Sequence, residues 1–322
     1  MNPDSKIYIA GHRGLVGSAL ARQLRLAGFN NLITRTRQDL DLMDSAAVAR
    51  FFQKEKPEFV FLAAAKVGGI QANSTYPAEF IHQNLAIQTH VIHEAWRAEV
   101  KRLLFLGSSC IYPRECPQPM KEEYLLTGPL EPTNRPYAVA KIAGIEMCWA
   151  YNRQYSTRFL PVMPTNLYGP GDNYDLERSH VIPAMVRKMH EAKLQGKNRV
   201  TVFGTGKARR EFLYVDDMAE ACVFLIRLPD KQFLPLVNQD RIPPLVNIGV
   251  GKDMSIRELA ERVREGVGFT GELDWDGSQP DGTPRKLMDV AKLTALGWTA
   301  PTGLREGLEK AYADFLKQPQ RV

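Results

Sequence analysis

Short apolar runs alternate with longer amphipathic stretches through the first half of the chain. Residues 7–10, 59–62 and 103–106 are almost wholly apolar, as expected of parallel strands buried on both faces. Residues 15–27 carry apolar positions at helical spacing, and Gly28 supplies a stop signal. Together these patterns predict an α/β fold of the Rossmann type, a doubly wound parallel sheet with helices on both faces.

Later stretches extend this pattern and suggest a second unit. Long helices are predicted over residues 77–98 and 136–154, the second with a proline at its start. A single strand is expected over residues 210–214, with Asp216 or Asp217 capping the helix that follows. We expect a large sheet domain and a smaller α/β domain; the large one takes residues 1–170 and 212–249, and the small one takes residues 171–211 and 250–322.

Composition is compatible with this plan. The 322 residues are 44% hydrophobic and 24% charged, enough for one large core with a smaller lobe. No apolar run approaches the roughly 20 residues of a membrane span, and the first residues lack the apolar core of a secretory signal. We therefore expect a cytosolic protein without a membrane partner.

Charge and cysteines narrow the chemistry. The formal net charge is +6, with Lys and Arg spread along the chain, which favours a basic cleft for a diphosphate over a nucleic-acid surface. The alternative is an ordinary solvated surface. The four cysteines form no Cys-x-x-Cys pair, so we expect free thiols and no metal site.

A glycine-rich loop lies between the first strand and the first helix. Gly11, Gly14 and Gly17 permit a tight turn, close approach to a pyrophosphate and close helix packing. The amino terminus of the helix then offers free N–H groups to an anion. The spacing is G-x-x-G-x-x-G, which resembles the short-chain dehydrogenase loop and predicts a nicotinamide dinucleotide. A tight turn without a ligand is the alternative.

The second predicted strand ends in arginines. An NAD site usually has a carboxylate there for the ribose, whereas Arg35 and Arg37 suit a 2′-phosphate. We therefore predict NADPH, with Arg37 the better contact, although both arginines would also be ordinary on a surface. Asp41, slightly later, would hydrogen-bond adenine or simply end the loop.

Tyr137 and Lys141 are four residues apart at the start of a predicted helix, so both side chains face one point. A nearby ammonium favours the phenolate of a tyrosine, whose ordinary pKa is about 10. Ser108 follows the strand that ends at Leu106, at the sheet edge where ligands bind. Each residue alone would be unremarkable, but their chain order with the glycine loop points to one site.

These elements resemble the extended short-chain dehydrogenase/reductases along nearly the whole chain. Residues 166–170, 210–217 and 247–249 also match patterns of the members that act on nucleotide-activated sugars. The segments around Cys110 and His180 look like those of the GDP-L-fucose synthase branch. That resemblance implies epimerisation of GDP-4-keto-6-deoxy-D-mannose at C3 and C5, followed by NADPH-dependent reduction at C4, giving GDP-L-fucose.

The resemblance also implies roles for particular residues. Cys110 and His180 would exchange protons at C3 and C5, Ser108 and Tyr137 would hold the enolate oxygen, and Lys141 would assist Tyr137. The nucleotide-sugar site would include Lys188, Phe203, Arg210 and Asp281; arginine and tryptophan would be expected at the first two positions. The cofactor contacts would be Gly11, His12, Arg13, Gly14, Leu15, Val16, Gly17, Arg37, Asp41, Leu106, Gly107, Ser108, Ser109, Lys141, Pro164, Thr165, Asn166, Leu167 and His180.

Three alternatives remain open at this stage. A cysteine after a buried strand is commonly a small apolar filler, and a histidine at a helix start is commonly a cap. A 4,6-dehydratase or 4-epimerase on the same scaffold would return its hydride to the substrate. A non-catalytic NADPH sensor would bind the cofactor alone. The resemblance further implies a homodimer through the helices over 77–98 and 136–154, whose apolar faces would equally suit burial within one chain.

Overall fold

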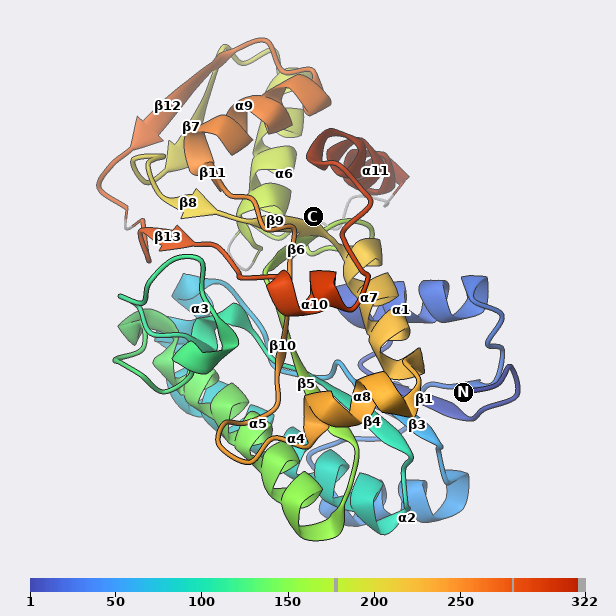
Figure 1. The fold of residues 1–322 in the computed structure, drawn as a ribbon. Helices are drawn as coiled ribbons and strands as arrows, with labels where there is room; N and C mark the ends of the chain where they lie inside the picture. Colours follow the sequence, from blue (N-terminus) through green and yellow to red (C-terminus); the bar gives the residue numbers. More distant parts are fainter. Residues whose placement is uncertain (177–178, 280, 318–322) are drawn as a thin grey trace.

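The structure, a computed structural model, describes residues 1–176, 179–279 and 281–317. Its main feature is a wholly parallel sheet with the strand order β10-β5-β4-β3-β1-β2 (Figure 1). The doubly wound α/β fold predicted from the sequence is therefore confirmed. The strands are β1 (Ile7–Ala10), β2 (Leu32–Ile33), β3 (Phe59–Leu62), β4 (Arg102–Leu106), β5 (Phe159–Pro164) and β10 (Val246–Ile248).

Both faces of this sheet are buried. In β1, Ile7 and Ile9 join one apolar cluster, while Tyr8 and Ala10 join another on the opposite face. This alternation follows from the two-residue period of a strand and explains the continuous apolar runs. The first cluster packs under α1 (Leu15–Leu26), α7 (Val215–Arg227) and α8 (Asp230–Val237), and the second under α2 (Ser45–Glu55), α4 (Pro77–Arg97) and α5 (Arg135–Tyr155).

The two long helices lie where the pattern predicted them. Helices α4 and α5 run side by side along one face of the sheet (Figure 1). Each has a proline in its first turn, where the missing N–H has no intrahelical partner to lose. The short helix α3 (Ile70–Thr75) precedes α4, and three 3₁₀ turns, η1 (Ser109–Ile111), η2 (Glu122–Tyr124) and η3 (Pro132–Asn134), lie between β4 and α5.

A smaller α/β part lies beside the carboxyl edge of the sheet, because the chain leaves β5 and β10 at their carboxyl ends to build it (Figure 1). Its core lies between α6, α9, α11 and the β7–β12 pair. Residues 177–178, 280 and 318–322 of the expected smaller domain lie outside the described residues. Its elements are β6 (Asn166–Tyr168), α6 (Val181–Leu194), β7 (Arg199–Phe203), β8 (Arg209–Arg210), β9 (Phe212–Tyr214), β11 (Met254–Ser255), α9 (Ile256–Val267), β12 (Glu272–Asp276), β13 (Arg285–Lys286) and α11 (Leu304–Lys317). Helix α10 (Ala291–Ala295) packs on β10 and belongs to the core of the large sheet.

The single strand expected over residues 210–214 was wrong. Strand β8 pairs with β11 and β13, whereas β9 pairs with β6 in a different sheet. The fully buried Glu211 divides them, and its carboxylate accepts backbone N–H groups from Gly251 and Met288. The capping prediction was also wrong: Tyr214 is the N-cap of α7, and both aspartates lie in its first turn.

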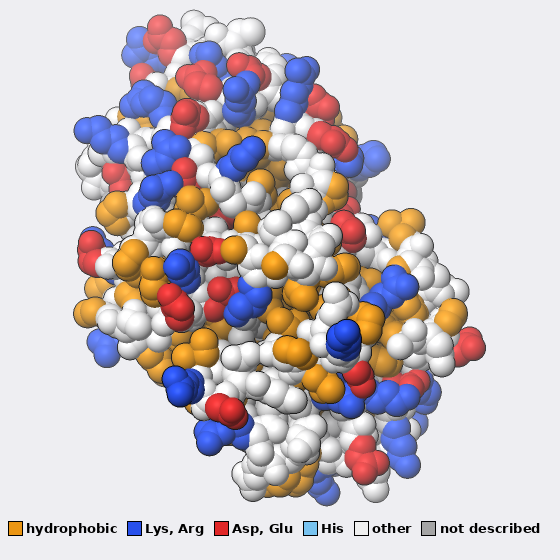
Figure 2. Space-filling view, viewed as in Figure 1, with side chains coloured by type: hydrophobic (Ala, Val, Ile, Leu, Met, Phe, Trp, Pro, Cys, Tyr) orange, Lys and Arg blue, Asp and Glu red, His pale blue; other side chains and the backbone are white. Residues whose placement is uncertain are grey.

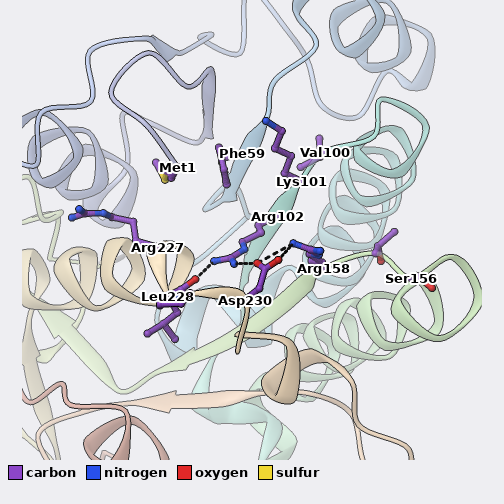
Figure 3. A pocket seen from close by; sticks show the side chains of 12 residues that line it. Met1, Phe59, Val100, Lys101, Arg102, Ser156, Arg158, Arg227, Leu228 and Asp230 are labelled. Atoms are coloured by element: carbon purple, nitrogen blue, oxygen red, sulfur yellow. Dashed lines mark hydrogen bonds and ion pairs between the residues drawn. The ribbon is translucent and has the colours of Figure 1, made fainter. Parts of the chain in front are cut away.

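At the amino edge of the sheet, Arg102 ties β4 to the junction of α7 and α8 (Figure 3). Its guanidinium donates to the carbonyl oxygens of Ile226 (2.7 Å) and Leu228 (2.6 Å) and to a carboxylate oxygen of Asp230 (2.5 Å). Arg158 donates to the same carboxylate at 2.9 Å. Arg102, Arg158, Leu228 and Asp230 line a cavity of ≈ 580 Å³, and the charge of Arg102 is paired with Asp230 within the fold.

Candidate active site

The glycine loop has the geometry of an anion cradle. Gly11 has φ +86°, which a side chain rarely adopts, and a Cβ at Gly17 would lie 2.1 Å from the carbonyl oxygen of Gly11. Helix α1 begins after Gly14 with no side-chain cap and no acidic residue in its first turn. The free N–H groups at this terminus therefore suit a pyrophosphate.

The two candidate arginines have different environments. The guanidinium of Arg35 is bound to Glu55 at 2.7 Å and to the carbonyl oxygen of Thr34 at 2.8 Å. The side chain of Arg37 is 73% exposed and lies 3.7 Å from the Asp41 carboxylate. Arg37 and Asp41 line a cavity of ≈ 460 Å³ together with Arg13, Thr36 and Gln38. The guanidinium of Arg37 is therefore available for a 2′-phosphate, and Arg13 lines the same cavity.

The carboxyl end of β4 carries the candidate serine and cysteine. Gly107 is tightly packed, since an added Cβ would lie 2.1 Å from the methyl carbon of Met163. Ser108 then caps the turn η1, and its Oγ accepts the N–H of Cys110 at 3.5 Å. Ser109 and Cys110 are buried within this turn. The turn thereby holds the Ser108 hydroxyl and the Cys110 thiol next to each other.

Helix α5 brings Tyr137 and Lys141 to the same point. The ammonium of Lys141 is buried, donates to the carbonyl oxygen of Leu106 at 2.8 Å and lies 5.8 Å from the Tyr137 ring centroid. The Tyr137 hydroxyl hydrogen-bonds Ser108. Burial lowers the pKa of Lys141 to about 8, and it raises that of Tyr137, with Cys110 adding to the rise and Ser108 opposing it. The structure thus gathers Ser108, Cys110, Tyr137 and Lys141.

The electrostatics of Cys110 involve a residue that the sequence analysis missed. Burial raises the pKa of the Cys110 thiol, and the strongest opposing influence is the Lys286 ammonium, followed by Ser108 and Lys141. Lys286 lies in the two-residue strand β13, too short to leave a periodic pattern in the sequence. A basic Arg-Lys pair after a Gly-Thr-Pro turn was the only signal for it.

His180 lies at the start of α6. Its side chain does not cap the helix, so the alternative of a simple N-cap is not supported. The residue keeps an exposed surface, yet the protein around it lowers the pKa of the imidazole by burial. The preceding Ser179 carbonyl lies against Gly69, before α3. No hydrogen bond joins His180 to Cys110 within the described residues.

The other expected cofactor contacts lie at the end of β5. Pro164 pairs with Ile248, and Val162 pairs with Leu106, so residues 164–167 border the segment 106–109. The Thr165 hydroxyl and the Asn166 amide both donate to the carbonyl oxygen of Glu211, at 3.2 and 2.9 Å. These bonds hold residues 164–167 at the carboxyl edge of the sheet, the same edge that carries the glycine loop.

The four expected substrate residues form two neighbouring pairs. The Lys188 ammonium lies 3.9 Å from the centroid of the exposed Phe203 ring, a cation–π arrangement. The Arg210 guanidinium donates to the carbonyl oxygen of Asp281 at 3.1 Å. The pairs are adjacent because a Cβ at Gly204, next to Phe203, would lie 2.4 Å from Asp281. Lys188 and Phe203, the two departures from the expected pattern, therefore contact each other.

Charged side chains of both signs are mixed on the surface of the protein. Figure 2 shows Lys and Arg interspersed with Asp and Glu on the visible face of both parts. Among the described residues no cluster of three or more His, Cys, Asp or Glu side chains is arranged to hold a metal ion. Within those same residues, no helix has the length and apolarity to cross a membrane.

The chain resembles known proteins along nearly its whole length. The model of the NAD dependent epimerase/dehydratase family matches residues 7–238. The chain is 57% identical to GDP-L-fucose synthase 1 of Arabidopsis thaliana over 98% of this chain and 94% of that protein. It is 52% identical to the GDP-L-fucose synthase of Escherichia coli (strain K12) over 98% of each.

Two solved structures show the same likeness. A GDP-6-OMe-4-keto-L-xylo-heptose reductase from C. jejuni is 40% identical with a TM-score of 0.93, covering 99% of both chains. A GDP-L-fucose synthetase from Naegleria fowleri bound to NADP is 27% identical with a TM-score of 0.85, covering 98% of this chain and 95% of that one. The shared fold includes both the glycine loop and the smaller part.

Proposed function

Because the chain belongs to the NAD dependent epimerase/dehydratase family and, within it, to the GDP-L-fucose synthases, we propose that it converts GDP-4-keto-6-deoxy-D-mannose to GDP-L-fucose. It is an NADPH-dependent epimerase/reductase with a Rossmann-type fold. The single observation that supports this chemistry most is the contact of Ser108 with both Cys110 and Tyr137, which joins a base to an oxygen-binding pair.

The first stage is inversion at C3 and C5. The C4 ketone acidifies both C–H bonds, since the electron pair left behind delocalises into the carbonyl as an enolate. The Cys110 thiolate takes the proton from one face, and the His180 imidazolium returns one to the other. Ser108 and Tyr137 donate hydrogen bonds to the enolate oxygen, where charge develops.

His180 suits the donor role for a physical reason. Partial burial and the N-terminus of α6 both disfavour the imidazolium, so its proton is given up readily. Cys110 has the opposite difficulty, because burial disfavours its thiolate. The base therefore depends on the cations beside it.

The second stage is reduction of the C4 ketone. NADPH, when bound in the glycine-loop cradle, supplies the hydride. Tyr137 donates its phenolic proton to the oxygen at C4 as the alkoxide forms, and the buried Lys141 ammonium stabilises the resulting phenolate. Lys141 is held for this by the Leu106 carbonyl.

Further residues hold the cofactor and substrate in this proposal. Arg37, with Arg13, binds the 2′-phosphate, because the cavity that they line is open while Arg35 is engaged. Arg210 binds the diphosphate, and the exposed Phe203 ring stacks on the base while Lys188 supplies charge nearby. Asp281 orients this group through its carbonyl bond to Arg210.

The assembly and the domain roles are part of the same proposal. Residues 1–170 with 212–249 bind NADP, and residues 171–211 with 250–322 bind the nucleotide sugar. Helices α4 and α5 pair with their copies in a homodimer; Tyr155, which is exposed and stacked on Trp96 at 4.3 Å, lies on that surface. The free thiols, Cys110 above all, suit a reducing compartment such as the cytoplasm.

A direct test uses GDP-4-keto-6-deoxy-D-mannose and NADPH in deuterated water. The product should have the L-fucose configuration, carry deuterium at C3 and C5 and consume one NADPH per molecule. A 4,6-dehydratase or 4-epimerase would consume no net NADPH, and a sensor would bind NADPH without turnover. Cys110→Ser should abolish deuterium uptake while NADPH still binds, and normal uptake in that variant refutes the base assignment.

A further inference from the structure

Lys286 is fixed beside the turn that carries Cys110 by bonds from its neighbours. Leu287 donates its N–H to Gln118 Oε1 at 2.9 Å and accepts the N–H of Met120 at 2.7 Å. Residues 118–120 belong to the loop that runs on from η1, the turn of Cys110. On the other side, Lys286 pairs in register with Arg210 of β8. The backbone therefore places Lys286 beside Arg210 of the candidate diphosphate site, on a strand that is tied to the loop after Cys110.

The charges around Lys286 do not neutralise it. The ammonium interacts with Cys110, Arg210, Glu131 and Cys116. Glu131 is already engaged, since its carboxylate lies 3.4 Å from Arg114 and accepts from the Thr133 hydroxyl at 3.2 Å. Within the described residues, no carboxylate lies within 4.0 Å of the Lys286 ammonium. Lys286 is half-buried, and a partly desolvated cation without a close counter-ion favours an anion beside it.

We propose that Lys286 is a positioning residue for the epimerisation, and that its ammonium stabilises the Cys110 thiolate and holds it as the base. This inference rests on the proposed function, in which Cys110 takes protons from C3 and C5. The thiolate and the ammonium form a neutral pair, so neither charge stands alone in a buried site.

The buried Lys141 and the half-buried Lys286 have different surroundings. The Lys141 ammonium donates a hydrogen bond to the Leu106 carbonyl and lies over the rings of Phe105 and Tyr137. Its position beside Tyr137 suits the reduction step. Among the described residues the Lys286 ammonium donates no hydrogen bond, and it is the strongest influence against the rise of the Cys110 pKa. Burial in turn lowers the pKa of Lys286, and Cys110 opposes that shift. Each of the two groups thus favours the charged form of the other, as the proposed pairing requires.

The first experiment titrates the thiolate without substrate. Ultraviolet absorbance of the thiolate is followed against pH in the wild type and Lys286→Met, with Cys110→Ser as the blank for the other cysteines. The midpoint should move to higher pH by about one unit or more, so that the thiolate fraction on the acid limb falls about tenfold. Lys286→Arg, which keeps the charge, should restore most of the shift. An unchanged midpoint in Lys286→Met overturns the inference.

The second experiment measures deuterium uptake at C3 and C5 against pH. Lys286→Met should move the acid limb of uptake to higher pH by the same amount, with NADPH binding retained. Arg285→Met is the matched control: the neighbouring side chain in β13 pairs with Asp253 at 2.5 Å and is 44% exposed. An equal shift in Arg285→Met would show a general loss of strand structure and overturn the inference.

The two proposals fail in distinguishable ways. If Cys110→Ser keeps normal uptake, the base assignment in the proposed function fails, whatever Lys286 does. If Cys110→Ser abolishes uptake but Lys286→Met leaves both the thiolate titration and the uptake profile unchanged, the proposed function stands and the pairing of Lys286 with Cys110 is wrong.

Discussion

At the amino edge of the parallel sheet, Arg102 is surrounded by two carbonyl oxygens and the Asp230 carboxylate. At the carboxyl edge, Lys141 is buried and Lys286 is half-buried, but within the described residues no carboxylate lies within 4.0 Å of either ammonium. Both edges desolvate a cation, and only the first compensates it fully from within the fold.

The difference separates two uses of a buried cation. A guanidinium that makes three bonds to acceptors of the fold, one of them a carboxylate, contributes to stability and has less left for a ligand. An ammonium left short of counter-charge destabilises the empty protein, and a reacting oxygen or sulfur anion relieves that cost. Arg35 and Arg37 repeat the contrast on a smaller scale, since only Arg35 is engaged by a carboxylate at close range.

The largest expected effect is on reduction. Lys141→Met should lower the rate of C4 reduction about 10²–10⁴-fold, because the Tyr137 phenolate loses its stabilising cation. Arg102→Met should keep the wild-type rate at temperatures where it is folded. Single-turnover oxidation of NADPH measures both. Equal losses in the two variants would contradict the distinction between the edges.

The next effect concerns the cofactor. Arg37→Ala should raise the KM for NADPH about 10–100-fold, the loss of one charge-assisted bond, and leave the KM for NADH nearly unchanged. Arg35→Ala is the control, because its guanidinium is held by Glu55. Steady-state kinetics with both cofactors give the ratio. If the preference for NADPH over NADH falls more in Arg35→Ala than in Arg37→Ala, then Arg35 rather than Arg37 binds the 2′-phosphate.

Stability should respond in the opposite sense at the two edges. Arg102→Met removes three bonds from a buried guanidinium and should lower the free energy of unfolding by about 2–4 kcal/mol. Lys141→Met replaces an uncompensated buried ammonium by an apolar chain and should leave stability equal or higher. Urea unfolding of the cofactor-free proteins measures both. Marked destabilisation of Lys141→Met would show that the lysine is structural.

The smallest effect is a pH dependence. Burial depresses the pKa of Lys141 to about 8 from an ordinary 10.5, so the folded protein releases a proton between these values that the unfolded chain keeps. The free energy of unfolding of the wild type should therefore rise relative to that of Lys141→Met as pH increases through that window. Below about pH 8, the wild type should show the whole loss of stability that the charged Lys141 causes. Parallel urea curves at about pH 7 and pH 10 test this. A constant difference would mean that the pKa of Lys141 is not depressed.

Local spacing carried most of the sequence-based prediction. The glycine loop, the Tyr137–Lys141 pair and the long helices each depend on residues a few positions apart, and the structure places all of them as expected. The expected NADP(H) cofactor agrees with the NADP-bound relative. The individual site roles remain proposals.

What could not be predicted depends on distant partners. The sequence placed Glu211 inside a single strand. In the structure its buried carboxylate accepts hydrogen bonds from the backbone N–H groups of residues 250, 251 and 288. Strand β13, which carries Lys286, is tied to the loop after Cys110 because Leu287 bonds to Gln118 and Met120. Contacts across such sequence separations leave no periodic trace in either segment.

Strand β10 joins the sheet beside β5, although more than eighty residues separate the two in the chain. During synthesis the N–H and C=O groups on this edge of β5 stay unpaired until residue 248 has been made. An unpaired strand edge is a template for other chains. A chain truncated before Val246 should therefore associate with other chains through the unpaired edge of β5. During synthesis, the full-length chain covers this edge only when β10 has been made and has paired with β5.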